Sequence, residues 1–280
     1  MKPDPAELLD DVKKIAFEAG EAIMAIYQQG EFDLYQKDDE SPVTSADYAA
    51  NEVLTKALQK LTPSIPILSE ESCEFSFSER KQWQAYWLLD PMDGTQEFVS
   101  RSGDFAVNIA LVVDGQPVLG VIYWPTQHTW YYAASQHGAF KQVGQNIEPI
   151  QVTQYATEGF DEADLRLAVS RVQKSNTVGQ YLVDAQQYKT VALGSCSLKS
   201  CMIAEGRADF YLRVGPTGEW DTGASHCILR EAGGNILDSE FNALSYNQRE
   251  TLANPDFIVI GDSKVDWKKV IIPHKTQRTL

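Results

Sequence analysis

Residues 88–98 read Leu88-Leu89-Asp90-Pro91-Met92-Asp93-Gly94-Thr95-Gln96-Glu97-Phe98. The apolar residues at its start and just before it predict a short buried strand that delivers Asp90. Asp90 and Asp93 are separated by a proline and one further residue, which predicts a turn where both carboxylates and the Met92 carbonyl converge on one point. Carboxylate and carbonyl oxygens are the ligands that Mg²⁺ prefers. Beside a glycine-threonine turn, they predict metal ions that hold a phosphate.

Two other interpretations of this run are weaker. An ordinary loop also favours Asp, Pro and Gly, but it does not explain why a buried strand should end in them. The haloacid dehalogenases carry their nucleophilic aspartate in D-x-D-G-T, with the two acids only two positions apart. The wider spacing of Asp90 and Asp93 excludes that mechanism.

Acidic residues elsewhere in the chain are candidates for the same site. Glu70 and Glu71 stand at the end of another predicted strand, and Asp221 opens a predicted helix. Alone, the two glutamates fit solvated side chains, and Asp221 fits the favourable charge at a helix N-terminus. Beside Asp90 and Asp93, metal ligation becomes the better interpretation for Glu70. A pair of ions needs a bridging carboxylate, for which Asp90 is the candidate.

Thr44 and Asp47 form the S/T-x-x-D pattern of a helix cap, and capping alone accounts for both residues. The functional alternative is that Asp47 orients Thr95, whose hydroxyl then helps to deprotonate a metal-activated water. Both interpretations can hold at once. The backbone amides of Gly94 and Thr95, if they begin a helix, form an anion site for the phosphate.

A second small-residue turn enters a predicted helix with a lysine in its first turn, and it reads Gly194-Ser195-Cys196-Ser197-Leu198-Lys199. Such a turn can hold another anionic group or a ribose. A lone turn of this kind is weak evidence for a binding site.

Helices and strands are predicted to alternate along the chain, which favours an α/β fold of two layered halves. Residues 1–150 carry most of the predicted metal ligands, and residues 151–280 complete the site. Helices are predicted from Asp4 to about Ile26, over 44–61, up to about 184, over 198–205 and over 220–232. Strands are predicted over 65–68, 86–89, 106–113, 118–124, 131–134, 167–170, 190–193, 209–212 and 257–260, and residues 30–42 as a polar loop.

The net charge of −15 argues against binding to nucleic-acid polymers or anionic membranes, which requires a positive surface. The net charge is compatible with binding of a small anionic substrate, because bound cations invert the local electrostatic field. No stretch approaches the ~20 apolar residues of a transmembrane segment. The four cysteines show no C-x-x-C or zinc spacing. We expect reduced thiols in a cytoplasmic protein, with peripheral association at the inner membrane as an alternative, and either a monomer or a homodimer.

These motifs together resemble the inositol monophosphatase superfamily, whose signature is D-P-x-D-G-T after a strand and, much later, W-D. The matching runs are Trp87 to Thr95 and Trp220 to Ala224, with Glu70-Glu71 upstream. The likeness extends over nearly the whole chain. Within the superfamily the chain is most similar to the bacterial CysQ-type 3'(2'),5'-bisphosphate nucleotidases, through runs such as Asn108-Ile109-Ala110-Leu111, Ser197-Leu198-Lys199 and Gly215-Pro216-Thr217.

The resemblance implies the αβαβα layered fold of the sugar phosphatases. It implies lithium-sensitive hydrolysis of the 3'-phosphate of adenosine 3',5'-bisphosphate to AMP, with a role in sulfur metabolism, and an inositol monophosphatase or other sugar-phosphate phosphatase as the alternative. It implies two or three Mg²⁺ ions per site, held by Glu70, Asp90, Met92 (through its carbonyl), Asp93 and Asp221. The water would be activated by Asp47, Thr95 and Glu70. The phosphorylated nucleotide would be held by Gly94, Thr95, Lys199, Ser195 and Ser197 of the two halves.

Three departures from the subfamily pattern bear on substrate preference, because none is a predicted ligand. Gln96 stands where lysine is usual, the turn from Gly194 to Lys199 is one residue longer, and Gly218-Glu219 replaces an uncharged pair. The rival substrates are inositol monophosphate and fructose 1,6-bisphosphate. A catalytically silent metal- or nucleotide-binding regulator is the rival of another class, and it would show no Mg²⁺-dependent phosphate release.

Overall fold

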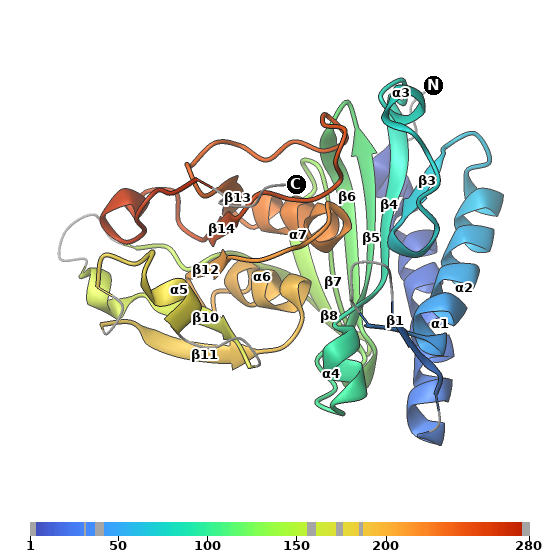
Figure 1. Cartoon of the computed structure of the whole chain (residues 1–280), viewed down its shortest axis with the longest axis horizontal. Helices are drawn as coiled ribbons and strands as arrows, with labels where there is room; N and C mark the ends of the chain where they lie inside the picture. The colour runs from blue at the N-terminus through green and yellow to red at the C-terminus, as the bar shows by residue number, and fades with distance from the viewer. Residues whose placement is uncertain are drawn as a thin grey trace.

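The structure, a computed structural model, describes residues 4–30, 32–36, 42–155, 161–171, 176–184 and 187–275. Helices α1 (Leu9–Gln29) and α2 (Ser45–Leu61) cover one face of a seven-stranded sheet, as Figure 1 shows. Helices α6 (Cys196–Ala204) and α7 (Trp220–Glu231) lie between that sheet and a five-stranded sheet. The short helices α5 (Asn176–Gly179) and η5 (Trp267–Lys269) pack outside the second sheet. The expected αβαβα layering is confirmed.

Each interface between layers has its own hydrophobic cluster. One lies between α1, α2 and the large sheet and includes Val12, Leu54 and Trp87. Another lies between the two sheets around α6 and α7. The last lies beyond the small sheet and includes Phe210 and Trp267. Burial of these apolar faces, at about 25 cal/mol per Å², is what holds the layers together.

The first two helices begin where the sequence predicts. Asp4 accepts a hydrogen bond from the Ala6 amide and starts η1 (Pro5–Leu8), which leads into α1. Thr44 and Asp47 form a complete capping box at the start of α2. The predicted polar loop before α2 contains two short strands instead, β1 (Leu34–Gln36) and β2 (Pro42–Thr44), which pair antiparallel; residues 37–41 lie outside the described residues.

The large sheet has the strand order β3-β4-β5-β6-β7-β8-β9, with β3 and β4 parallel and the other neighbours antiparallel. The strands are β3 (Ile67–Ser69), β4 (Ala85–Asp93), β5 (Ala106–Val113), β6 (Gln116–Trp124), β7 (Thr129–Ala134), β8 (Ala139–Val143) and β9 (Asn146–Ile150). Four short helices connect them: η2 (Glu70–Ser72), α3 (Phe77–Arg80), α4 (Thr95–Val99) and η3 (Pro125–Gln127). Strands β8 and β9 were not predicted, because most of their side chains are polar or exposed and show no apolar alternation.

The small sheet has the strand order β11-β10-β12-β14-β13, and β10 is parallel to both of its neighbours. Its strands are β10 (Arg166–Ser170), β11 (Lys189–Leu193), β12 (Phe210–Arg213), β13 (Asn235–Asp238) and β14 (Phe257–Ile260), with η4 (Glu162–Asp164) before β10. The predicted helix up to about residue 184 extends too far: the described residues contain only the short α5, and residues 180–184 are not helical. Helix α5 ends at Gly179, and Leu182 pairs with Ile271 as an isolated bridge.

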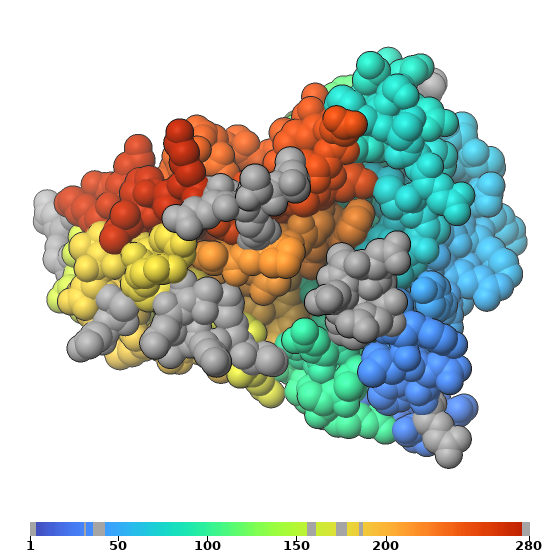
Figure 2. All heavy atoms as spheres, viewed as in Figure 1, coloured from blue at the N-terminus to red at the C-terminus, as the bar shows by residue number. Residues whose placement is uncertain are grey.

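Helix α7 ties the two halves of the chain together. Although it belongs to the second half, it packs on β5 and β6 of the first. Gly120 makes this approach possible, since a Cβ there would lie 2.2 Å from the Ala224 carbonyl oxygen. Figure 2 shows the orange region that contains α6 and α7 between the teal part of the chain and the yellow-to-red part. The division into domains at residue 150 stays a prediction.

The packing of α6 and α7 brings their N-terminal ends to the carboxyl end of β4. This junction is where the predicted site residues of the two halves meet. In the described part of the chain, no helix has both the length and the apolar character needed to cross a membrane.

Candidate active site

Asp90 and Asp93 lie on one strand, and a β-bulge takes the place of the expected turn. β4 continues through both residues, and its pairing with β5 shifts register between Asp90, opposite Asn108, and Asp93, opposite Ala106. Residues three apart in a regular strand point to opposite faces, but the extra residue of a bulge returns the second to the face of the first. Both carboxylates therefore face the α6–α7 side of the sheet.

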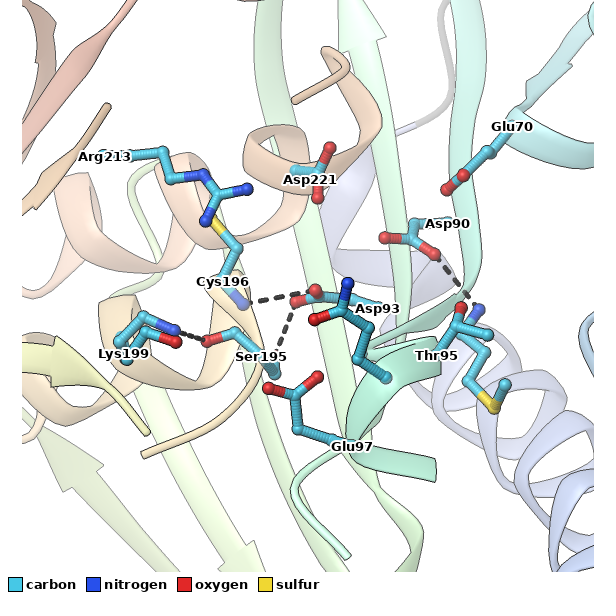
Figure 3. A pocket seen from close by; sticks show the side chains of 14 residues that line it. Glu70, Asp90, Asp93, Thr95, Glu97, Ser195, Cys196, Lys199, Arg213 and Asp221 are labelled. Atoms are coloured by element: carbon cyan, nitrogen blue, oxygen red, sulfur yellow. Dashed lines mark hydrogen bonds between the residues drawn. The ribbon is translucent and has the colours of Figure 1, made fainter. Parts of the chain in front are cut away.

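Carboxylate oxygens of Asp90, Asp93 and Asp221 all lie within 4.8 Å of one another. Burial, followed by the charges of Glu70 and Asp93, raises the pKa of Asp90. Burial and then the charge of Asp93 raise the pKa of Asp221. Figure 3 shows the Glu70 side chain pointing from η2 toward Asp90. Carboxylates held this close repel one another unless positive charge lies among them, so the donor set fits a hard divalent cation.

The start of α6 holds the Asp93 carboxylate. Its Oδ2 accepts hydrogen bonds from the Ser195 hydroxyl (2.6 Å), the Ser197 hydroxyl (2.6 Å) and the Ser197 amide (2.7 Å). Its Oδ1 accepts one from the Cys196 amide at 3.1 Å (Figure 3). The structure thus places both serines against Asp93, where their hydroxyls orient a candidate metal ligand. Their contact with a nucleotide stays a prediction.

Thr95 and Asp47 meet as the sequence suggested. The Thr95 hydroxyl donates to Asp47 Oδ1 at 3.1 Å. Asp47 Oδ2 accepts from both the amide and the hydroxyl of Thr44, each at 2.7 Å. Asp47 therefore serves as part of the helix cap and also orients Thr95, so the two interpretations are compatible. Burial raises the pKa of Asp47.

Two cationic side chains line the same cavity. Lys199 is buried in α6, donates a hydrogen bond to the Ser195 carbonyl, and has its pKa lowered by burial. Arg213, at the end of β12, donates from Nη2 to the Pro216 carbonyl at 3.1 Å, while its buried Nε has no partner within the described chain. Sequence reasoning missed Arg213. The available signal was a basic residue at a predicted strand end directly before the Gly215-Pro216-Thr217 run.

The cavity itself has a volume of about 240 Å³ and takes residues from both halves of the chain. Besides the three aspartates, Glu70, Thr95 and the two cations, it is lined by Met92, Gly94, Gln96, Glu97, Ser170, Ser195 and Cys196. Gly94 has a left-handed φ of 109°, and a Cβ there would lie 2.9 Å from the Asp104 carbonyl oxygen, so a side chain would not fit. The metal contact of the Met92 carbonyl and the phosphate contact of Gly94 and Thr95 stay predictions.

Comparison with known proteins gives this geometry a context. Residues 4–273 match the inositol monophosphatase family. The 3'(2'),5'-bisphosphate nucleotidase CysQ of Haemophilus influenzae is 43% identical over 94% of this chain and 96% of its own length. That of Salmonella typhimurium is 42% identical over 90% of this chain and 99% of its own.

Solved structures agree with the sequence matches. The crystal structure of CysQ from Bacteroides thetaiotaomicron, described as a bacterial member of the inositol monophosphatase family, superposes with a TM-score of 0.75. It is 32% identical and covers 92% of this chain and 97% of its own. The suhB protein of Bartonella henselae shares the fold with a TM-score of 0.76 at 24% identity over 94% of this chain and 96% of its own. Because the family match, the sequence identity and the structural likeness all agree, the chain belongs to the inositol monophosphatase family.

Proposed function

We propose that this protein hydrolyses the 3'-phosphate of adenosine 3',5'-bisphosphate and related 3'-phosphonucleotides to AMP, or the matching nucleotide, and phosphate. The observation that carries the proposal is the cluster of Asp90, Asp93 and Asp221 in a cavity that also holds Lys199 and Arg213. The full-length similarity to 3'(2'),5'-bisphosphate nucleotidases supports the choice of substrate.

The acids would hold two or three Mg²⁺ ions. Glu70, Asp90, Asp93, Asp221 and the carbonyl of Met92 are the proposed ligands, and the bound ions supply an activated water and neutralise charge on the phosphate. Asp93 reaches this role already oriented, since four hydrogen bonds from the start of α6 fix its carboxylate.

Thr95 is the proposed contact of the attacking water. Its hydroxyl donates to Asp47 Oδ1, so its lone pairs are directed elsewhere and can accept a hydrogen bond from the water. The Asp47 carboxylate thereby fixes the direction in which Thr95 accepts. Glu70, on the opposite side of Asp90, is a second group that can take up the proton.

The two cations are the proposed contacts for the substrate's negative charge. Lys199 and Arg213 line the cavity on the α6–β12 side, away from Thr95 (Figure 3). A substrate with two phosphates uses both cations, whereas inositol monophosphate has a single phosphate that the metal ions already neutralise. This charge distribution favours the bisphosphorylated nucleotide over the inositol ester.

Phosphate release from adenosine 3',5'-bisphosphate and from inositol 1-phosphate, compared with Mg²⁺ and with added Li⁺, tests the proposal. We expect preference for the nucleotide, a requirement for Mg²⁺ and inhibition by Li⁺, with Asp93→Asn as the inactive control. Preference for inositol 1-phosphate would replace the substrate but keep the mechanism. No release from either ester would contradict a hydrolase.

A further inference from the structure

Glu97 is an acidic side chain that neither the metal cluster nor the proposed reaction uses. It lies on α4, is only 8% exposed, and lines the active-site cavity. Figure 3 shows its carboxylate pointing from α4 toward Asp93 and Ser195. The carboxylate accepts a hydrogen bond from the backbone amide of Glu97 itself, and in the part of the chain that the structure describes no basic side chain forms an ion pair with it. One local hydrogen bond leaves most acceptor sites of a buried carboxylate unfilled, and a donor on a bound ligand can fill them.

Three other donors in the region of Glu97 and Asp104 are engaged with other groups. Arg171 pairs with Asp104 at 3.1 Å, and the Gly194 amide donates to the same carboxylate at 2.8 Å. The Lys199 amino group donates to the Ser195 carbonyl. Burial and then the charge of Asp93 raise the pKa of Glu97. The nearby charges are those of Asp93 and Asp104, opposed by Lys199, and any hydrogen bond to this carboxylate beyond that of its own amide is left to whatever enters the cavity.

The position of Glu97 is nevertheless built into the fold. A Cβ at Gly194 would lie 2.3 Å from Glu97 Cγ and 2.6 Å from Asp104 Cβ, so the glycine makes room for both acids. The carbonyl of Glu97 accepts a hydrogen bond from the Ser102 amide at 3.1 Å, which ties down the backbone. Close packing rather than charge pairing places the carboxylate, as expected for a group kept for a ligand.

The location limits which part of a substrate Glu97 can meet. Glu97 lies four residues beyond Asp93, in the first turn of the helix that begins at Thr95, so it would meet a substrate close to the scissile phosphate. Phosphate oxygens would be repelled, and ribose carbons offer no donor. The donor that lies next to the phosphate ester is the hydroxyl on the neighbouring ribose carbon.

We infer that Glu97 accepts a hydrogen bond from the ribose hydroxyl adjacent to the scissile phosphate and so selects ribonucleotides over deoxyribonucleotides. The inference rests on the proposed function and names the part of the nucleotide that Glu97 contacts. It also suits the relatives' 3'(2') designation. A 3'-phosphate has a free 2'-hydroxyl and a 2'-phosphate a free 3'-hydroxyl, so one acceptor serves either isomer.

The test compares kcat/KM for adenosine 3',5'-bisphosphate and its 2'-deoxy analogue in the wild type, Glu97→Gln and Glu97→Ala. The wild type is expected to favour the ribonucleotide by about 10- to 100-fold, the factor for one hydrogen bond to a charged group. In Glu97→Ala the ratio should fall to near one, with an intermediate value for Glu97→Gln. Glu148→Gln on the exposed strand β9 removes the same charge outside the cavity and should keep the wild-type ratio.

Thermal unfolding without substrate gives a second measurement. Removing a buried negative charge that no basic side chain pairs with should leave the Tm of Glu97→Gln equal or higher, which also shows that the variant folds. Equal rates for both nucleotides in the wild type, or an unchanged ratio in Glu97→Ala, would overturn the inference while leaving the nucleotidase intact. Release of phosphate from neither nucleotide would overturn the proposed function and the inference with it.

Discussion

Ser197 donates two hydrogen bonds to Oδ2 of Asp93, one from its amide at 2.7 Å and one from its hydroxyl at 2.6 Å. The two residues are 104 positions apart in the sequence, and they join the start of α6 to the end of β4. A carboxylate fixed by several donors has lost most of its freedom before a metal ion arrives. The orientation of Asp93 is therefore decided by the second half of the chain, and this relationship leads to the first prediction.

Ser197→Ala and Ser195→Ala should each weaken activation by Mg²⁺ about 10- to 100-fold, because outer partners of metal ligands contribute on that scale. The measurement is the Mg²⁺ concentration for half-maximal phosphatase activity, with direct Mg²⁺ titration calorimetry beside it. Ser200→Ala is the matched control, since its hydroxyl, on the same helix, donates to the Cys196 carbonyl at 3.3 Å and not to Asp93. Equal Mg²⁺ activation in all three variants would mean that the serines do not position Asp93.

Thr95→Val and Asp47→Asn should each lower kcat by about 10²- to 10⁴-fold, as expected when a proton acceptor loses its orientation. The double variant should be little worse than the poorer single variant, because the two groups act as one unit. Thr44→Ala separates this effect from helix capping. It should cost about 1 kcal/mol of stability with a much smaller effect on kcat. Additive losses in the double variant would argue for independent roles.

Arg213→Ala should reduce kcat/KM for adenosine 3',5'-bisphosphate by about 10- to 100-fold, because one charge-assisted contact to a phosphate is removed. The loss for adenosine 3'-monophosphate should be much smaller, since that substrate has no second phosphate. Arg207→Ala, an exposed arginine outside the cavity, controls for net charge. Equal losses on both nucleotides would show that Arg213 acts at the scissile phosphate or on the fold.

Gly120→Ala should lower the free energy of unfolding by about 1–3 kcal/mol, because the new Cβ would overlap the Ala224 carbonyl oxygen, 2.2 Å away. Helix α7 must move to relieve this overlap, and it carries Asp221, so Mg²⁺ activation should weaken as well. In Gly144→Ala the new Cβ would have no heavy atom within 4 Å, so the substitution adds only the backbone strain of a φ of 59°. That control should lose stability in urea unfolding but keep normal Mg²⁺ activation.

His226 should make the folded state sensitive to acid. It lies between the Tyr246 hydroxyl (2.9 Å) and Asn235 Oδ1 (3.0 Å), and burial lowers its pKa to about 4. An unfolded histidine titrates near ~6.5. Below that pH the unfolded chain binds a proton at this histidine, whereas the buried imidazole of the folded chain stays neutral until about pH 4. The free energy of unfolding should therefore fall as the pH drops from ~6.5 to about 4, by up to about 1.4 kcal/mol per pH unit from this group.

Urea unfolding at several pH values measures this contribution against His226→Gln. The variant should start less stable at pH 7 and lose less on acidification, so that the two curves converge toward pH 4. His137→Gln, an exposed histidine, should follow the wild type. Parallel curves for His226→Gln and the wild type would place the acid sensitivity in other groups.

The sequence by itself determined much of this protein. The helices α1 and α2, the α2 cap, the strands β5 and β6 and the order of the acidic motifs all follow from local patterns, since each depends on residues a few positions apart. The resemblance carried by these motifs predicted the layered fold, which the structure confirms.

Only the tertiary structure decided the rest. The use of Ser195 and Ser197 to hold Asp93, the entry of Arg213 and Glu97 into the cavity, and the bulge that replaces a turn each depend on contacts with segments that are distant in sequence. No local pattern reports such contacts, because a side chain's partner is set by how the layers stack and not by its neighbours along the chain. Gly120 and Gly194 show this plainly: each is one small residue in a sequence, and each is required because another element must come close to it.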